Sequence, residues 1–359
     1  MGLPETRIEF VEKADSFIRR LGRGMVCWLH ISAGASKAKV YSLRASDDLD
    51  KALTSETDKE KLIAQAKRMF EFGASRVLIV VAQTFDIAKP QLELLRFNYL
   101  ACPEASAEML TWAKEVGYKT GRAFILFTDT EEAANSKDGH VVAVYPAASK
   151  VAVGTAMDVA AITAGCTDRS TTNFTVVHNS ALTAEQVAAY PGKTEANTKT
   201  DAGYLTLFND GEKIKIGRGI TSHYRVDALE PNNDTQRSKW SKVRSVDVMN
   251  LIKDDIADTF ENTYRGKVGN SYENKMNFCT QINGTYFKNM SGDLLNPDAE
   301  NFVDVNVNKH IELIKAQGVD PDTMSESEIR KYDTGSVVML SGKVTILDMM
   351  EDLDIVLTV

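Results

Sequence analysis

Short apolar runs alternate with amphipathic stretches through the first 150 residues of the chain. Residues 25–31 and 76–81 are runs of apolar side chains of the kind found in strands buried on both faces. Between them, Leu62, Ala66 and Met69 recur at helical spacing. Strands that alternate with helices predict a largely parallel sheet covered by helices on both faces. Further strands are predicted at 97–101, 123–127 and 141–145, and a further helix at 106–116.

The helix between the first two strands carries recognisable end signals. Thr57 stands three positions before Glu60, which is the spacing of a capping box with Thr57 at the N-cap. Gly73 is expected to end this helix. Residues 151–164 are mainly small and apolar, and they predict a helix buried in the core.

A hairpin and a polar linker mark the middle of the chain. Residues 204–208 and 213–216 alternate like strands, and the Asp210-Gly211 pair between them suits the positive φ of a tight turn. Residues 229–238 form a polar stretch, and we place a domain boundary there.

The last third opens with a strongly amphipathic helix, because apolar residues from Met249 to Phe260 fall on one face and charged residues on the other. Further helices are predicted at 271–290 and 325–332, a mixed segment at 302–316, and strands at 336–340 and 343–347.

The chain ends on another strand-like run, and a strand-like arm is also predicted near the N-terminus. An exposed apolar strand is a template for pairing with another chain, so proteins usually cover such an edge. The terminal strand could close the protein's own sheet, or it could complete a sheet in a neighbouring subunit. The residues that would pair are Ile8, Phe10, Ile355, Val356, Leu357 and Val359.

Composition narrows the class of protein. The chain is 43% hydrophobic and 26% charged with a formal net charge of -8, as in an ordinary globular protein. It has no long basic run to bind nucleic acid and no stretch of about 18 apolar residues to insert into a membrane. The four cysteines lie far apart, which indicates reduced thiols and synthesis in a cytoplasm, with no secretory signal at the N-terminus.

Catalytic motifs are hard to find in this sequence. There is no glycine-rich phosphate loop, and the five histidines show no metal-binding spacing, so no catalytic, cofactor or metal residues are predicted. Asp254, Asp255 and Asp258 share a polar helix face, which indicates a solvated or salt-bridged surface. Residues 154–157 are similar to the nucleophile motif of subtilisin-like proteases, but Ala156 stands where the serine would be, and acyl-enzyme chemistry needs that hydroxyl.

An enzyme or small-molecule binding protein stays open as an alternative. Parallel sheets often bind ligands at the carboxyl ends of their strands, where a site can be assembled from scattered residues.

Several blocks in a fixed order resemble the contractile tail sheath proteins of myophages, R-type bacteriocins and prophage tails. The most specific is 264–271, which is close to the pattern Y-x-G-K-V-x-N-S. The resemblance covers the chain from residue 155 to the end and is weaker before it. The other blocks are 161–165, 170–172, 203–211, 214–216, 218–221, 240–247, 254–256, 333–337 and 349–354.

The resemblance implies an α/β multi-domain fold with a largely parallel or mixed core, a C-terminal α+β domain and extended strand arms at both ends. The expected divisions are an arm at 1–23, the core at 24–235 with a possible sub-boundary near 95, a domain at 236–342 and an arm at 343–359.

The resemblance also implies a structural function without a cofactor. Sheath subunits form stacked hexameric rings around an inner tail tube, and they contract to drive the tube through a target envelope. The expected partners are further copies of the chain, the tube protein, and baseplate and tail terminator proteins. Synthesis is expected in a bacterial host cytoplasm, and the mature location is a virion tail or an extracellular contractile particle. In such an assembly the two terminal arms pair with sheets of adjacent subunits.

Overall fold

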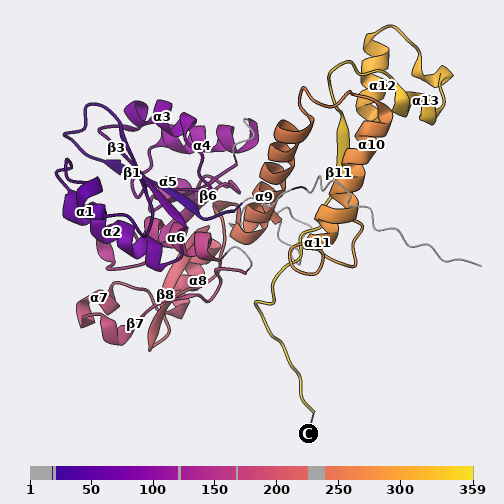
Figure 1. Ribbon diagram of the computed structural model, residues 1–359. Coiled ribbons are helices and arrows are strands. Elements are labelled where there is room, and N and C mark those ends of the chain that lie inside the picture. The colour runs from indigo at the N-terminus through magenta and orange to yellow at the C-terminus, as the bar shows by residue number, and fades with distance from the viewer. Residues whose placement is uncertain (1–17, 19–21, 120–122, 167–168, 225–238, 359) are drawn as a thin grey trace, which may run out of the picture. The chain divides into compact units, whose positions relative to one another are not determined.

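The computed structural model describes residues 18, 22–119, 123–166, 169–224 and 239–358, which fall into two compact units (Figure 1). Of these residues, the large unit takes in those within 22–254 and 346–358, and the small unit takes in residue 18 and 255–345. The division into four segments drawn from the sequence stays a prediction.

A nine-stranded mixed sheet forms the centre of the large unit. Its strands, in chain order, are β1 (Met25–Ile31), β2 (Lys39–Leu43), β3 (Arg76–Ala82), β4 (Tyr99–Ala101), β5 (Ile125–Thr128), β6 (Val141–Tyr145), β7 (Thr175–His178), β8 (Tyr204–Asn209) and β9 (Lys213–Ile216).

The strand order is β2-β3-β1-β4-β5-β6-β8-β9-β7. Six neighbouring strands run parallel, namely β3, β1, β4, β5, β6 and β8. At the edges of the sheet, β2 pairs antiparallel with β3, and β9 pairs antiparallel with β8 and β7. The predicted α/β class with a parallel or mixed core is therefore confirmed, and so is the hairpin, which β8 and β9 form.

Successive residues of each central strand enter two different cores. Val26 and Trp28 of β1 belong to one buried cluster, whereas Cys27 and Leu29 belong to the other. Both faces are covered by helices, which explains why the strand sequences are continuously apolar. The helices of the large unit are α1 (Leu49–Ala52), α2 (Lys59–Glu71), α3 (Phe85–Leu94), α4 (Ala107–Lys119), α5 (Glu131–Ala134), α6 (Ala156–Gly165), α7 (Ala184–Ala188) and α8 (Lys193–Asp201).

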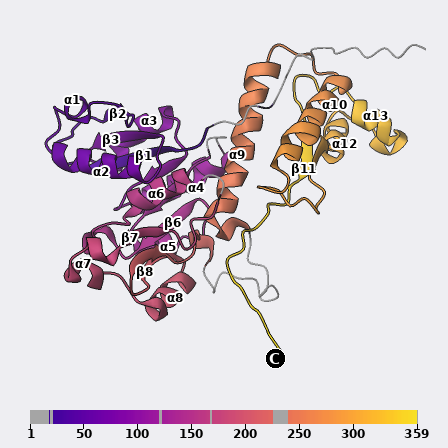
Figure 2. The same cartoon turned by 60° about the horizontal axis from the view of Figure 1, so that its bottom comes forward.

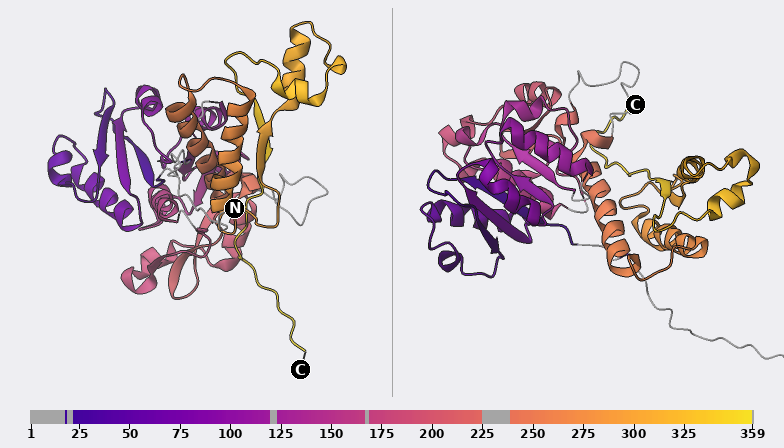
Figure 3. Two further views of the ribbon diagram at one scale, coloured as in Figure 1. Left: turned by 45° about the vertical axis from the view of Figure 1, so that its right-hand side comes forward. Right: turned by 90° about the horizontal axis from the view of Figure 1, so that it is seen from above.

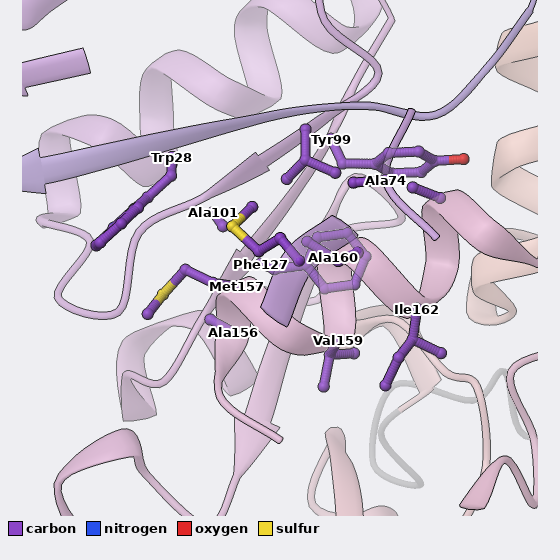
Figure 4. Packing of buried hydrophobic residues seen from close by; sticks show 14 of the residues in the cluster. Trp28, Ala74, Tyr99, Ala101, Phe127, Ala156, Met157, Val159, Ala160 and Ile162 are labelled. Carbon is purple, nitrogen blue, oxygen red and sulfur yellow. The ribbon is translucent and has the colours of Figure 1, made fainter. Parts of the chain in front are cut away.

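Helices α2 and α6 pack on the Trp28 face, while α3, α4 and α5 pack on the Leu29 face. Figure 4 shows Met157 and Ala160 of α6 gathered with Phe127 of β5. Every residue of α6 from 156 to 164 is buried, so the predicted buried helix is confirmed, although it begins five residues later than expected.

The start of α2 differs from the prediction. Asp58, and not Thr57, occupies the N-cap position, and it makes no capping hydrogen bond. Its carboxylate Oδ2 instead lies 2.9 Å from Nε2 of His30, at the end of β1. The predicted helix end is confirmed, because α2 stops before Gly73, which has a φ of +109°.

The small unit combines helices with a two-stranded antiparallel sheet. Helix α9 (Val243–Thr259) crosses the boundary between the units and continues as a π-helical turn at Phe260–Tyr264. The predicted helix 271–290 is confirmed, with a π-helical segment in its second half. The remaining elements are α10 (Tyr272–Gln281), α11 (Lys288–Met290), β10 (Phe302–Val305), α12 (Val307–Ala316), α13 (Glu326–Lys331) and β11 (Leu340–Lys343). Figure 2 shows β11 of the two-stranded sheet beside α10 and α12.

The strands predicted at 336–340 and 343–347 are wrong in their bounds, because a single strand, β11, spans Leu340–Lys343. A turn precedes it, in which the backbone N–H of Val337 donates to the carbonyl oxygen of Thr334 over 3.2 Å. The strand begins at Leu340, after this turn.

Candidate functional site

After the small unit, the C-terminal segment returns to the large unit and is held there by charged and hydroxyl side chains. The holding groups lie on the loops before β7 and after β9, in the short turn before α9 and, for Arg244, in the first turn of α9. We call this arrangement the clasp. It consists of Asp348, Glu351 and Asp352 on the C-terminal segment and of Ser170, Thr172, Arg218, Lys239, Lys242 and Arg244 on the rest of the large unit.

Glu351 lies at the centre of the clasp, with only 12% of its side chain exposed. Its Oε1 accepts hydrogen bonds from the hydroxyls of Thr172 at 2.7 Å and Ser170 at 3.1 Å. Its Oε2 lies 3.4 Å from Nη1 of Arg218. Burying a carboxylate is costly unless it is paired and hydrogen-bonded, and these three groups meet that need.

Arg218 also holds the next carboxylate of the segment. Its Nη2 lies 2.6 Å from Oδ1 and 2.7 Å from Oδ2 of Asp352. This hydrogen bond is the main reason why the pKa of Arg218 lies above its ordinary value and that of Asp352 below.

The upstream end of the segment is fixed by two lysines and an arginine. Asp348 pairs with Lys239 and lies 3.6 Å from Nζ of Lys242. Burial alone would raise the pKa of Asp348, but the two lysines outweigh it and lower the pKa. Arg244 donates through Nη1 to the carbonyl oxygen of Leu347 over 2.6 Å, so the main chain is held as well as the side chains.

Gly219 lets the two loops of the clasp touch. A Cβ at this position would stand 2.4 Å from Oγ1 of Thr171, which is closer than atoms can approach without displacement. The N–H of Gly219 donates to Oγ1 of Thr172 over 2.9 Å. The same hydroxyl donates to Glu351, so it links the turn after β9 to the C-terminal segment.

Beyond Asp352 the chain is extended and pairs with no strand among the described residues, and Figure 3 shows it running out from the large unit to the end labelled C. Ile355, Val356 and Leu357 are 61%, 88% and 83% exposed, which is unusual for side chains of this size. The structure thus brings these three predicted arm residues together on one free segment. The other predicted arm residues, Ile8, Phe10 and Val359, lie outside the described residues.

The polar residues of the clasp were not among the predicted site residues. Their signal was nevertheless present, because 170–172, 218–221, 240–247 and 349–354 are four of the blocks that carry the resemblance. The sequence shows these blocks in order, and the structure shows that they meet at one place.

The motif-like residues 154–157 have a structural role. Thr155 is the N-cap of α6, and Asp158 accepts hydrogen bonds from the N–H groups of Gly154 at 2.8 Å and Thr155 at 3.2 Å. Ala156 is fully buried. This stretch therefore begins a helix and offers no nucleophile.

A hollow of about 300 Å³ lies at the carboxyl ends of β1 and β4, where a doubly wound sheet would bind a ligand. Its only thiol is that of Cys102, and burial raises the pKa of that thiol to about 12, which makes it a poor nucleophile. Within the described ranges, no three metal-ligating side chains gather in one place. No helix among the described residues is both long and apolar enough to cross a membrane.

The chain is similar to known proteins of one class. The chain is 26% identical, over 99% of its length and 98% of the relative's, to a tail sheath protein of Clostridium phage phiCD119. No protein-family model matches the chain.

Solved sheath structures share the fold. The sheath tail protein of Desulfitobacterium hafniense superposes with a TM-score of 0.58 at 13% identity, covering 84% of this chain and 93% of that one. The PVC sheath complex of an extracellular contractile injection system, in its contracted state, gives a TM-score of 0.61 at 14% identity, covering 100% and 98%.

These comparisons confirm the resemblance to contractile tail sheath proteins. The homologue and the structural neighbours are structural sheath proteins of phage tails and contractile injection systems, and they are not enzymes. The alternative of an α/β enzyme has no support from them.

Proposed function

We propose that this chain is the repeating subunit of a contractile sheath, which polymerises around an inner tail tube and shortens to drive that tube through a target envelope. The full-length similarity to a phage tail sheath protein and the shared fold with a contracted injection-system sheath support this function. Hexameric rings stacked along a helix are the proposed arrangement, with the tube protein, the baseplate and a tail terminator as partners.

Contraction of this kind requires one subunit to pack in two ways. Stacking along an axis uses heterologous contacts that do not close, and a change in those contacts converts the extended sheath to the contracted one. The free energy then comes from the difference between the two packings, so no nucleotide or cofactor is consumed.

The observation that carries the proposal is the free apolar segment after the clasp. We propose that Ile355, Val356, Leu357 and Val359 pair as a strand with a second copy of the chain, and that Ile8 and Phe10 do so from the N-terminal arm.

A sheet in the small unit is a suitable acceptor for these arms. The sheet of β10 and β11 has two strands in the described part of the chain, and sheets this small gain stability from added strands. Phe302 at the start of β10 is 37% exposed, which leaves apolar surface for an incoming side chain.

Deleting residues 353–359 tests the proposal, because this truncation leaves the clasp intact. The truncated protein should keep its melting temperature but form less than a tenth of the wild-type polymer, as measured by sedimentation and electron microscopy. Val356→Asp should act like the truncation. Leu94→Asp, at a residue 75% exposed on α3, is the matched control and should polymerise normally. Normal tubes from the truncated chain would contradict the proposal.

We also propose synthesis in a bacterial host cytoplasm, followed by assembly into a virion tail or an extracellular contractile particle. Cys27, Cys102, Cys166 and Cys279 are buried and form no disulfide, as expected for a protein folded under reducing conditions. Immunogold labelling of intact particles with an antibody to this chain would locate it on a tail, and labelling of no such particle would contradict the assignment.

A further inference from the structure

We propose that the clasp is a positioning site for assembly: it fixes the point at which the C-terminal arm leaves the subunit and limits how far that arm reaches toward a second copy of the chain. This inference rests on the proposed function and assigns a role to residues that do not themselves pair with the neighbour.

The clasp sets the reach of the arm. With the clasp closed, the free chain begins after Asp352, and residues 353–359 span at most about 25 Å when fully extended. With the clasp open, the free chain begins after the buried Ile346, and residues 347–359 span at most about 45 Å. A shorter tether confines the arm to a smaller volume and raises its effective concentration at a nearby acceptor. The acceptor strand must then begin within about 25 Å of Asp352.

The contacts of the clasp suit a positioning role better than a role in stabilising the fold. None of the residues 347–352 belongs to either hydrophobic core cluster of the large unit. Asp352 is 74% exposed, yet Arg218 holds it along with the nearly buried Glu351. An isolated exposed ion pair contributes little, whereas several charges that share partners hold a segment in one place. Loosening the clasp should therefore free the arm while leaving the large unit folded.

Charge reversal at Arg218 tests this role. Arg218→Glu places a negative charge beside Glu351 and Asp352. The double variant Arg218→Glu with Asp352→Arg restores an ion pair between positions 218 and 352 with the two charges exchanged. Arg265→Glu is the control, because Arg265 pairs over 3.4 Å with Glu261 in the small unit, where both side chains are 65% exposed.

Two readouts separate release of the arm from failure of assembly. A nitroxide attached through Met350→Cys reports local motion, and it can be placed selectively because the four native thiols are buried. Arg218→Glu should convert an immobilised spectrum to a mobile one and reduce the yield of long polymers at least tenfold. The double variant should recover both, and Arg265→Glu should match the wild type in both.

Each other outcome has a distinct meaning. An unchanged spectrum for Arg218→Glu would show that the clasp does not hold the segment, and a mobile spectrum with normal polymers would show that holding it does not position the arm. Either result overturns the inference and leaves the proposed function intact. Wild-type protein that never polymerises, alone or on its tube, would overturn the proposed function and the assembly role of the clasp together.

Discussion

Asn270 donates an amide hydrogen to the carbonyl oxygen of Gly335 over 2.7 Å, across 65 positions of the sequence. The same nitrogen lies 3.1 Å from Oγ1 of Thr334 and 3.2 Å from the carbonyl oxygen of Val337. Two blocks of the family resemblance, 264–271 and 333–337, are therefore in direct contact. Asn270 holds the turn that leads into β11.

Replacing Asn270 by alanine should destabilise the small unit. Loss of the amide removes one donor shared by three acceptors, and because the bonds to Gly335 and Val337 are exposed, the cost should be about 0.5–1.5 kcal/mol. Urea unfolding followed by circular dichroism measures the change. Asn274→Ala is the control, because the amide of Asn274 donates at the surface to Gly269 and its removal should cost clearly less.

Replacing Arg23 should strongly destabilise the large unit. Its side chain is 3% exposed and lies 2.9 Å from Asp247 and 3.1 Å from Asp254. Arg23→Met leaves these carboxylates without their buried cation, and breaking a buried pair in this way costs about 3–5 kcal/mol. The exposed Arg265→Met should cost less than about 1 kcal/mol in the same unfolding experiment. Equal effects of the two changes would refute this account.

Gly219→Ala should open the clasp without a change of charge. The added methyl would collide with Thr171, whose buried hydroxyl cannot move away freely, and overpacking of this kind costs about 1–3 kcal/mol. A nitroxide attached through Met350→Cys should become mobile. Gly192→Ala adds the same methyl where no atom lies within 4 Å, so it should leave the spectrum unchanged.

Stability should fall as the pH drops below neutrality, because of His140. This residue is buried, and its burial lowers its pKa below the ordinary 6.5, even though the nearby carboxylate of Asp138 opposes the shift. The unfolded chain then binds a proton more readily than the folded one. The contribution of the neutral ring is complete above pH 6.5 and is lost as the pH falls through that value toward the lower pKa of the folded state.

A series of melting temperatures between pH 8 and pH 5 measures this effect, taken about the ordinary His pKa near 6.5. His140→Gln should flatten the profile, and a variant as pH-sensitive as the wild type would assign the effect to other groups.

Much of the large unit could be predicted from the sequence because its signals are local. The run from Met25 to Ile31 is apolar at every position that faces either core, and the Asp-Gly turn fixes the hairpin of β8 and β9. The sequence pattern does not predict helix α3, because this helix contains Pro90, and proline usually ends a helix.

The clasp could not be predicted, because its contacts are not local. Arg218 and Asp352 lie 134 positions apart, and Ser170 and Glu351 lie 181 apart. In sequence, charged and hydroxyl residues on loops look the same whether they face water or one another. The same limit explains the wrong N-cap of α2, since only the fold places His30 beside Asp58.

The clasp also determines which part of the subunit bears a force that is applied to the C-terminal arm. A pull on Leu357 reaches the loops around Arg218 and Thr172 before it reaches β11, because the chain is anchored at Glu351 and Asp352 on its way back from that strand. Tension along the arm is therefore carried by the nine-stranded sheet of the large unit while the ion pairs hold. The two-stranded sheet, which a pull along the chain would peel apart one hydrogen bond at a time, is shielded from that force.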